Sequence, residues 1–115
     1  MSDQPNPTPN QNPPVFVSAV AAVRRARRSL ALPAAILTGI LDRSIVGRER
    51  YGTDLQAGNG RDAGRDCWEE ALDAVMYATQ AVIEAQTPGD RERWRAVQAR
   101  ALDLADAVAI ARRLP

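Results

Sequence analysis

The chain has 115 residues, with fifteen basic and fourteen acidic side chains, one cysteine and no histidine. This length accommodates one small domain, and the near-neutral charge excludes a general attraction to nucleic acid, which is not expected as a partner. One cysteine excludes an internal disulfide bond, and a chain without histidine cannot build a Cys/His zinc site. No apolar run reaches membrane-spanning length and no secretory leader pattern is present, so we expect a cytoplasmic protein outside the membrane.

The N-terminal segment differs in composition from the rest of the chain. Residues 1–14 hold five of the eight prolines and no apolar residue after Met1. Such a segment cannot bury enough surface to offset the entropy of ordering it, so we predict a disordered tail over residues 1–14.

Residues 15–115 are predicted to fold as a single helical domain. They are rich in Ala, Leu, Val and Arg and lack alternating β-branched runs, a composition that favours closely packed helices. We therefore predict an all-α fold, a small bundle of about four helices. Because about a hundred residues form only a marginal core, we expect a homo-oligomer to complete it.

The first two helices are expected over residues 15–30 and from Pro33 to about Tyr51-Gly52. Apolar residues recur at helical spacing in both segments, Pro33 suits a first helical turn, and Gly52 suits a helix end. The first helix closes on a basic cluster, Arg24, Arg25, Arg27 and Arg28. Basic side chains at a helix C-terminus interact favourably with the helix dipole, which is sufficient to explain the cluster.

A loop with three glycines, residues 52–61, separates these helices from the next two. We predict Asn59 as the N-cap of a third helix that runs to about Gln86, since asparagine is a favoured N-cap residue. Thr87 at the N-cap and Pro88 at the first helical position then predict a fourth helix, to about Arg113.

One face of the third predicted helix is entirely acidic. The residues on it are Asp62, Asp66, Glu69, Glu70 and Asp73, and we call them the acidic stripe. The neighbouring Arg61 and Arg65 fall on the other side of the helical wheel. The predicted core-facing set lies opposite the stripe and consists of Trp68, Leu72, Val75, Val82 and Ile83.

The stripe has two interpretations. A simple solvated polar face is the more common one, but such faces usually mix charges, because each like-charge pair at i,i+4 costs a helix ~0.2–0.5 kcal/mol. A divalent cation removes this conflict, and Mg²⁺ prefers carboxylate oxygens together with phosphate oxygens and water. The wheel narrows such a site to Asp66, Glu70 and Asp73, with Tyr77 beside them. Arg61, next to Asn59 in the glycine-rich loop, could contact a phosphate.

Three segments together resemble a known family. Glu49-Arg50-Tyr51-Gly52, Asn59-Gly60-Arg61-Asp62 and Glu70-Ala71-Leu72-Asp73 followed by Tyr77 look like MazG-type all-α nucleoside triphosphate pyrophosphohydrolases, particularly small phage-encoded forms. The family signature is an ExxE pair on one helix and an ExxD pair on the next. Glu70 and Asp73 match the second pair, and twenty residues separate Glu49 from Glu70, which fits the last acid of the first pair.

The first acidic pair departs from the family pattern. Val46 lies three residues before Glu49, where the family has a glutamate, and the nearest other acid on that helix is Asp42. Asp42 is seven residues from Glu49 and therefore on nearly the same helix face.

The resemblance implies Mg²⁺-dependent hydrolysis of a (deoxy)nucleoside triphosphate to the monophosphate and pyrophosphate, at a site between the second and third helices. It implies catalytic roles for Glu49 and Glu70. The expected metal ligands are Glu49, Asp66, Glu70 and Asp73, and the expected substrate-binding residues are Asn59, Arg61 and Tyr77.

Two alternatives of other classes remain open. The cluster Arg24–Arg28 could make the protein a non-catalytic helical module that binds nucleic acid or an acidic protein partner. Acidic and basic regions could also pair between subunits of a purely structural oligomer.

Overall fold

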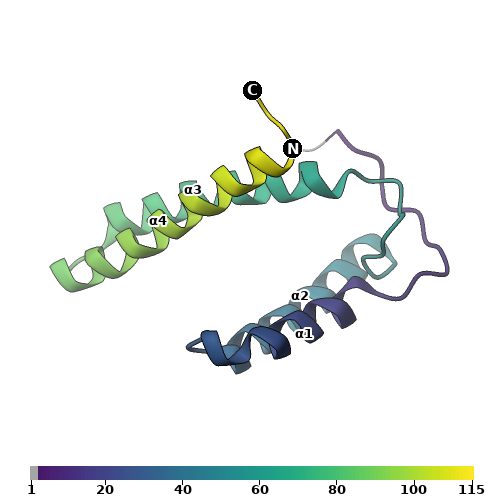
Figure 1. Ribbon diagram of the computed structural model, residues 1–115, viewed down its shortest axis with the longest axis horizontal. Coiled ribbons are helices and arrows are strands. Elements are labelled where there is room, and N and C mark those ends of the chain that lie inside the picture. The colour runs from purple at the N-terminus through teal and green to yellow at the C-terminus, as the bar shows by residue number, and fades with distance from the viewer. Residues whose placement is uncertain (1–2) are drawn as a thin grey trace. The chain divides into compact units, whose positions relative to one another are not determined.

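The computed structural model describes residues 3–115, and these residues form an all-α protein (Figure 1). Its α-helices are α1 (Val15–Ala26), α2 (Pro33–Tyr51), α3 (Ala63–Glu84) and α4 (Pro88–Ala111), with a short 3-10 helix, η1 (Arg27–Ser29), after α1. The described residues contain no β-strand. The predicted all-α fold with about four helices is therefore confirmed.

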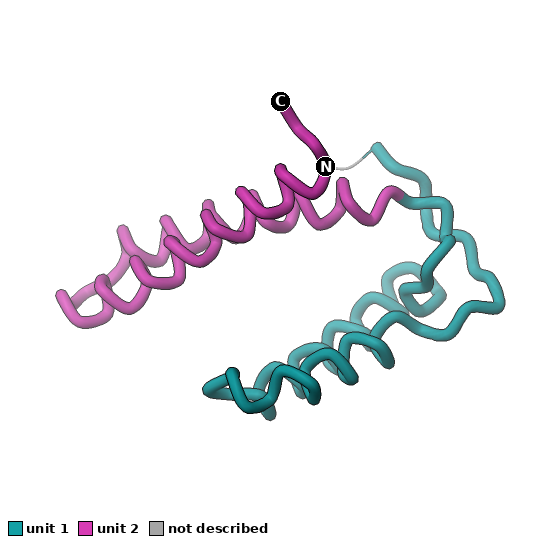
Figure 2. Tube along the Cα trace, viewed as in Figure 1, with its two compact units in different colours: residues 1, 3–61 teal, residues 2, 62–115 magenta. Residues whose placement is uncertain are grey.

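The chain divides into two compact units, coloured separately in Figure 2. Unit 1 covers residues 3–61 and contains α1, η1 and α2, whereas unit 2 covers residues 62–115 and contains α3 and α4. The sequence predicted one helical domain over residues 15–115, and the division within this range falls between the two helix pairs. Its physical origin is local: each pair of helices is joined by a short connection, which favours packing between sequence neighbours.

Helix ends that depend on a single residue type lie where the sequence predicted them. Pro33 is at the start of α2, and Gly52 ends it in the left-handed conformation with φ 73°. The hydroxyl oxygen of Thr87 accepts a hydrogen bond from the Asp90 amide at 3.1 Å, which caps α4. These positions are confirmed because proline, glycine and threonine act at helix ends through their own backbone or side-chain geometry.

The start of α3 corrects the predicted cap. The helix begins at Ala63, and its N-cap is Asp62, whose side chain accepts a hydrogen bond from the Arg65 amide at 3.0 Å. Asn59 cannot cap this helix because Gly60 follows it with φ 84°, which is outside the right-handed helical region.

The N-terminal segment also differs from its prediction. Residues 1 and 2 lie outside the described residues, but the rest of the predicted tail is hydrogen-bonded to the loop after α2. The Thr8 amide donates to the Asn59 carbonyl oxygen and the Val15 amide donates to the Leu55 carbonyl oxygen, both at 2.8 Å. Backbone and amide side-chain hydrogen bonds thus order a segment that has no apolar side chain to bury.

Unit 2 is held together by a seam of small side chains. Its buried residues are Ala71 and Ala78 of α3 and Ala101 and Val108 of α4. Of the predicted core-facing set, Leu72 is 38% exposed and Ile83 is 78% exposed, so these two predictions are wrong. Trp68, Val75 and Val82 are half-buried. Alanine forms the seam because small side chains let two helix backbones approach closely.

Unit 1 has a smaller core. Val23 of α1 is its buried apolar residue, and an open groove of about 450 Å³ runs between α1 and α2. The groove is lined by Phe16, Val17, Val20, Ala21, Arg24, Leu37 and Leu41. Among residues 3–115, every helix is too short or too polar to cross a bilayer.

Candidate functional site

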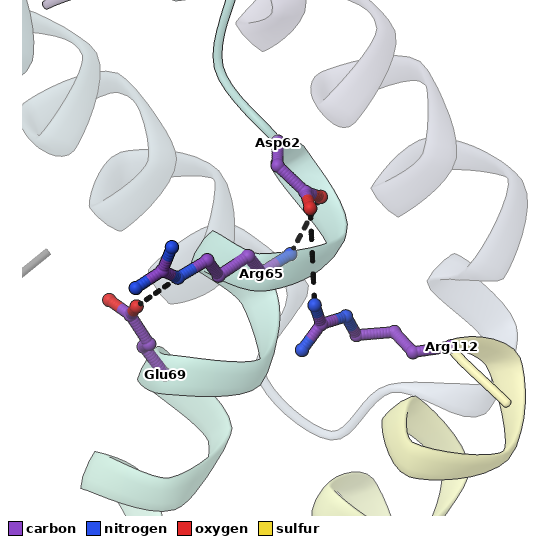
Figure 3. Close-up of polar contacts among 4 residues, drawn as sticks. All are labelled: Asp62, Arg65, Glu69 and Arg112. Atoms are coloured by element: carbon purple, nitrogen blue, oxygen red, sulfur yellow. Dashed lines mark hydrogen bonds and ion pairs between the residues drawn. The ribbon is translucent and has the colours of Figure 1, made fainter. Parts of the chain in front are cut away.

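The acidic stripe begins at the first turn of α3, and its first member is engaged in structure. Asp62 caps the helix through the Arg65 amide, and its Oδ2 lies 3.9 Å from Nη2 of Arg112 (Figure 3). A carboxylate at a helix N-terminus is stabilised by both the cap bond and the helix dipole. Asp62 therefore has a structural role at the start of α3.

Glu69 is also paired. Its Oε1 accepts a hydrogen bond from Nε of Arg65 at 3.1 Å, an i,i+4 ion pair on the surface of α3 (Figure 3). Arg65 lies four residues before Glu69 and so only about 40° from it around the helix, which corrects the prediction that Arg65 falls on the other side from the stripe. The stripe is therefore less uniformly acidic than the sequence alone indicated.

Glu70 and Asp73 remain as an uncompensated acidic pair. They lie at i,i+3 on one face of α3. Both residues are beyond the first turns of the helix, so the helix dipole no longer stabilises their negative charges. Glu70 is exposed and Asp73 is half-buried. Within residues 3–115, neither side chain has a hydrogen bond or an ion pair. These two carboxylates are open to a ligand from solvent.

Asp66 and Tyr77 extend this face in both directions. Asp66 lies in the first turn of α3, where the helix dipole favours a negative charge. Tyr77 lies one turn beyond Asp73 and is 69% exposed. An aromatic ring this exposed does not contribute to the core of unit 2, so it is available to contact a bound molecule.

The other predicted site residues belong to unit 1. Glu49 is an exposed residue in the last turn of α2, and Val46, three residues before it, is 45% exposed. Asn59 is only 6% exposed, and its Oδ1 accepts a hydrogen bond from the Arg61 amide at 3.1 Å. The Arg61 guanidinium donates through Nη1 to the Pro5 carbonyl oxygen at 2.8 Å.

Glu70 and Asp73 fit the chemistry of a magnesium ligand. In the described part of the chain, no three Cys, Asp or Glu side chains gather into a metal-binding group. Mg²⁺, however, is usually held by only one or two carboxylates, with substrate phosphates and water completing its octahedral shell. Two uncompensated carboxylates one helical turn apart meet this requirement when a phosphate-bearing substrate supplies the remaining oxygens.

The sequence did not predict two ion pairs in this region, Arg65–Glu69 and Arg112–Asp62. The Arg65–Glu69 pair could have been identified, since an i,i+4 spacing brings opposite charges together on any helix. The contact between Arg112 and Asp62 carries no local signal, because it joins the end of α4 to the start of α3 through the packing of the hairpin.

Comparisons of this chain with protein-family models, with curated proteins and with solved structures found no match. Any function proposed for this chain therefore rests on the geometry and chemistry of its own residues.

Proposed function

We propose that this protein is a Mg²⁺-dependent (deoxy)nucleoside triphosphate pyrophosphohydrolase of the MazG-like type, acting as a cytoplasmic homo-oligomer. The observation that supports the proposal best is the Glu70–Asp73 pair. Its residue types and spacing are those of the ExxD signature. The structure leaves the two carboxylates without a partner in residues 3–115, while arginines engage Asp62 and Glu69.

The energetics of the pair favour a cation. Two carboxylates one helical turn apart repel each other, and no described arginine offsets that repulsion. Glu70 and Asp73 would hold a divalent cation, which would offset their repulsion and supply positive charge to the phosphates of a nucleotide. When bound, Mg²⁺ neutralises charge on the phosphate oxygens.

The proposed reaction splits a phosphoanhydride bond. A water oxygen forms a bond to the α-phosphorus, and the bond from the α-phosphorus to the α–β bridging oxygen breaks. The products are the nucleoside monophosphate and pyrophosphate. The water proton passes to a carboxylate, which acts as general base. Glu70 and Asp73 are the proposed metal ligands, with Asp66 on the same face of α3, and Glu49 is proposed either as the general base or as a further ligand.

A panel of dNTPs and NTPs with Mg²⁺, scored for pyrophosphate, tests the proposal. Glu70→Gln and Asp73→Asn should each reduce pyrophosphate release on the order of 100-fold or more, since each removes a charged ligand. Chelation of Mg²⁺ with EDTA should abolish release from the unmodified chain.

Asp103→Asn is the matched control. Asp103 is an exposed acid on α4 without a hydrogen bond or ion pair in the described residues, so its neutralisation should leave the rate unchanged. Circular dichroism should show equal helix content in all variants. If no nucleotide in the panel releases pyrophosphate, the proposed activity is wrong.

A second candidate function rests on the basic cluster. Arg24, Arg25, Arg27 and Arg28 are exposed, and within residues 3–115 their side chains have no ion pair or hydrogen bond. No acidic residue occurs between positions 4 and 41. This end of unit 1 therefore carries four uncompensated charges, which favour a polyanionic partner.

Nucleic-acid binding at several salt concentrations separates the two functions. If each of the four arginines neutralises one phosphate of duplex DNA, a plot of log affinity against log salt concentration should have a slope of about −3.6. Replacing the four arginines by Gln should abolish that binding, whereas Glu70→Gln should not affect it. Binding without salt dependence would eliminate this candidate.

A further inference from the structure

The N-terminal segment, residues 5–14, lies along the loop formed by residues 55–61. Besides the Thr8–Asn59 backbone bond, the Asn10 amide donates to Oε1 of Gln56 at 3.1 Å, and Nδ2 of Asn10 and of Asn12 donate to the Ala57 carbonyl oxygen at 2.9 and 2.8 Å. An isolated β-bridge between Pro14 and Gln56 continues the pairing. The two segments are more than forty residues apart in sequence, so this contact is part of the fold of unit 1.

Gln56 is the centre of the contact. Besides accepting from the Asn10 amide, its side chain donates through Nε2 to the Asn10 carbonyl oxygen at 2.9 Å and to the Asn12 carbonyl oxygen at 2.6 Å. One side-chain amide thus makes three hydrogen bonds to the N-terminal segment. Its replacement should weaken the contact more than replacement of any other single residue in the loop.

The proline pattern of the segment suits one-sided pairing. Prolines occupy positions 5, 7 and 9, and Thr8 and Asn10, each directly after a proline, supply the amides that donate to the loop. In an extended chain, residues two apart present their backbone groups to the same edge. One edge therefore carries the N–H donors, whereas the other carries prolines, which have no N–H to donate to another chain. Proline also lowers the entropy lost when the segment is ordered.

Ordering the loop of residues 55–61 has a high entropic cost, which contacts with the N-terminal segment can offset. Gly58 and Gly60 have φ of 69° and 84°, and glycine loses more conformational freedom on ordering than any other residue. A Cβ on Gly58 would lie 3.5 Å from Nδ2 of Asn12, so the segment packs directly against the loop backbone. Asn59, between the two glycines, is the buried polar residue of the described chain.

The contact extends to Arg61, because Pro5 provides the carbonyl oxygen that accepts from its guanidinium. A guanidinium is planar, and a fixed acceptor restricts its orientation. The same segment that orders the loop backbone therefore also holds the side chain at the end of the loop.

We propose that residues 5–14 are an intramolecular clasp that folds the loop of residues 55–61 and positions Arg61 to bind phosphate. The folding of the loop by the clasp stands on the structure alone, whereas the phosphate role of Arg61 rests on the proposed function. In this proposal Gln56, Asn10 and Pro5 are positioning residues, which act on substrate through the loop and through Arg61.

Hydrogen exchange of the loop amides, followed by mass spectrometry of peptides that cover residues 53–62, tests the clasp. Gln56→Ala, Asn10→Ala and a chain lacking residues 2–12 should each exchange these amides on the order of tenfold faster than the unmodified chain. Asn6→Ala is the matched control, because Asn6 is an exposed asparagine of the same segment without a hydrogen bond in the described residues. Unchanged loop exchange in the shortened chain would overturn the clasp.

Rescue distinguishes a clasp from a general loss of folding. A synthetic peptide of residues 3–14, added at millimolar concentration to the shortened chain, should restore slow exchange in the loop and leave exchange in α3 and α4 unchanged. Fast exchange throughout the shortened chain, without rescue by the peptide, would contradict a local role for the segment.

Steady-state kinetics test the positioning of Arg61. In a chain that releases pyrophosphate, Gln56→Ala should raise KM for the nucleotide on the order of tenfold and change kcat much less, since it removes binding rather than chemistry. An unchanged KM together with faster loop exchange would overturn the role of Arg61. If no variant releases pyrophosphate, the proposed function and the phosphate role of Arg61 fail together, and the exchange data alone decide the clasp.

Discussion

Carboxylates of the acidic stripe differ in their surroundings although they share one helix. Asp62 is fixed by a cap bond and by Arg112, and Glu69 is fixed by Arg65, whereas Glu70 and Asp73 have no described partner. Paired acids stabilise the hairpin locally. An unpaired acid couple in mid-helix costs stability, so its presence is more consistent with ligand binding than with a role in folding.

The substitution Val46→Glu tests the proposed metal site at the scale of a single residue. Val46 is 45% exposed and lies one helical turn before Glu49, so a glutamate there is accommodated without loss of core. Val46→Glu would complete the ExxE pair of the family pattern. Because affinity for a divalent cation rises with the number of charged ligands, the apparent Mg²⁺ affinity should rise on the order of tenfold, measured as pyrophosphate release against Mg²⁺ concentration.

Ile36→Glu provides the control for added charge. Ile36 is 40% exposed, close to the 45% of Val46, but it lies more than three turns before Glu49 and about 140° from it around α2. The same substitution at this position should leave the Mg²⁺ dependence unchanged. Equal effects of the two substitutions would show that net charge is responsible, and would contradict a restored ligand pair.

The site could be predicted from sequence only where it depends on spacing along one helix. The Glu70–Asp73 pair is a prediction of this kind, because residues three apart on a helix share a face, and its resemblance to the ExxD signature selects it from the acidic stripe. The pairing of Asp62 with Arg112 depends on tertiary packing and had no signal in the sequence. The cap of α3 was assigned to Asn59 instead of Asp62, since both residues are good caps and only the backbone of Gly60 distinguishes them.

At the scale of elements, helix ends were predictable and helix packing was not. Pro33, Gly52 and Thr87 determine helix ends through their own geometry, so sequence located them correctly. The packing face of α3 was assigned to its large apolar residues, but the buried positions are Ala71 and Ala78. Much of the circumference of α3 is apolar, so periodicity alone did not show which part of it packs against α4.

The alanine seam predicts a strong dependence on side-chain size. Ala71 is only 1% exposed, so a larger side chain there would force α3 and α4 apart. We expect Ala71→Leu to lower the free energy of unfolding by about 1–3 kcal/mol, the usual cost of overpacking. Urea denaturation followed by circular dichroism measures this change.

Ala99→Leu is the comparison for the seam. Ala99 is an exposed alanine of α4, two residues before the buried Ala101, and it receives the same added volume. Because its side chain faces solvent, the free energy of unfolding should change by no more than the ~0.5 kcal/mol typical of surface substitutions. A stable Ala71→Leu variant would mean that α3 and α4 pack less closely than the seam indicates.

On the scale of the whole molecule, much apolar surface lies outside the small cores of the two units. On α3 the exposed apolar residues include Leu72, Met76 and Ile83, which are spaced four and seven residues apart and thus form one stripe away from the alanine seam. Burying one such side chain contributes about 1.5–3 kcal/mol. In the proposed homo-oligomer, this stripe is the surface that we expect a second copy of the chain to cover.

The last prediction follows from that stripe and from the proposed homo-oligomer. We expect sedimentation equilibrium to give a mass above that of one chain, and the double variant Met76→Lys/Ile83→Lys to return the protein to one-chain mass, because two charges would have to be desolvated in the interface. Ile110→Lys is the control: Ile110 is 70% exposed on α4 but lies outside the stripe, so the oligomer should persist. A one-chain mass for the unmodified protein at all concentrations would contradict the proposed oligomer. Pyrophosphate release by the double variant as a single chain would show that the Glu70–Asp73 face acts without a second copy.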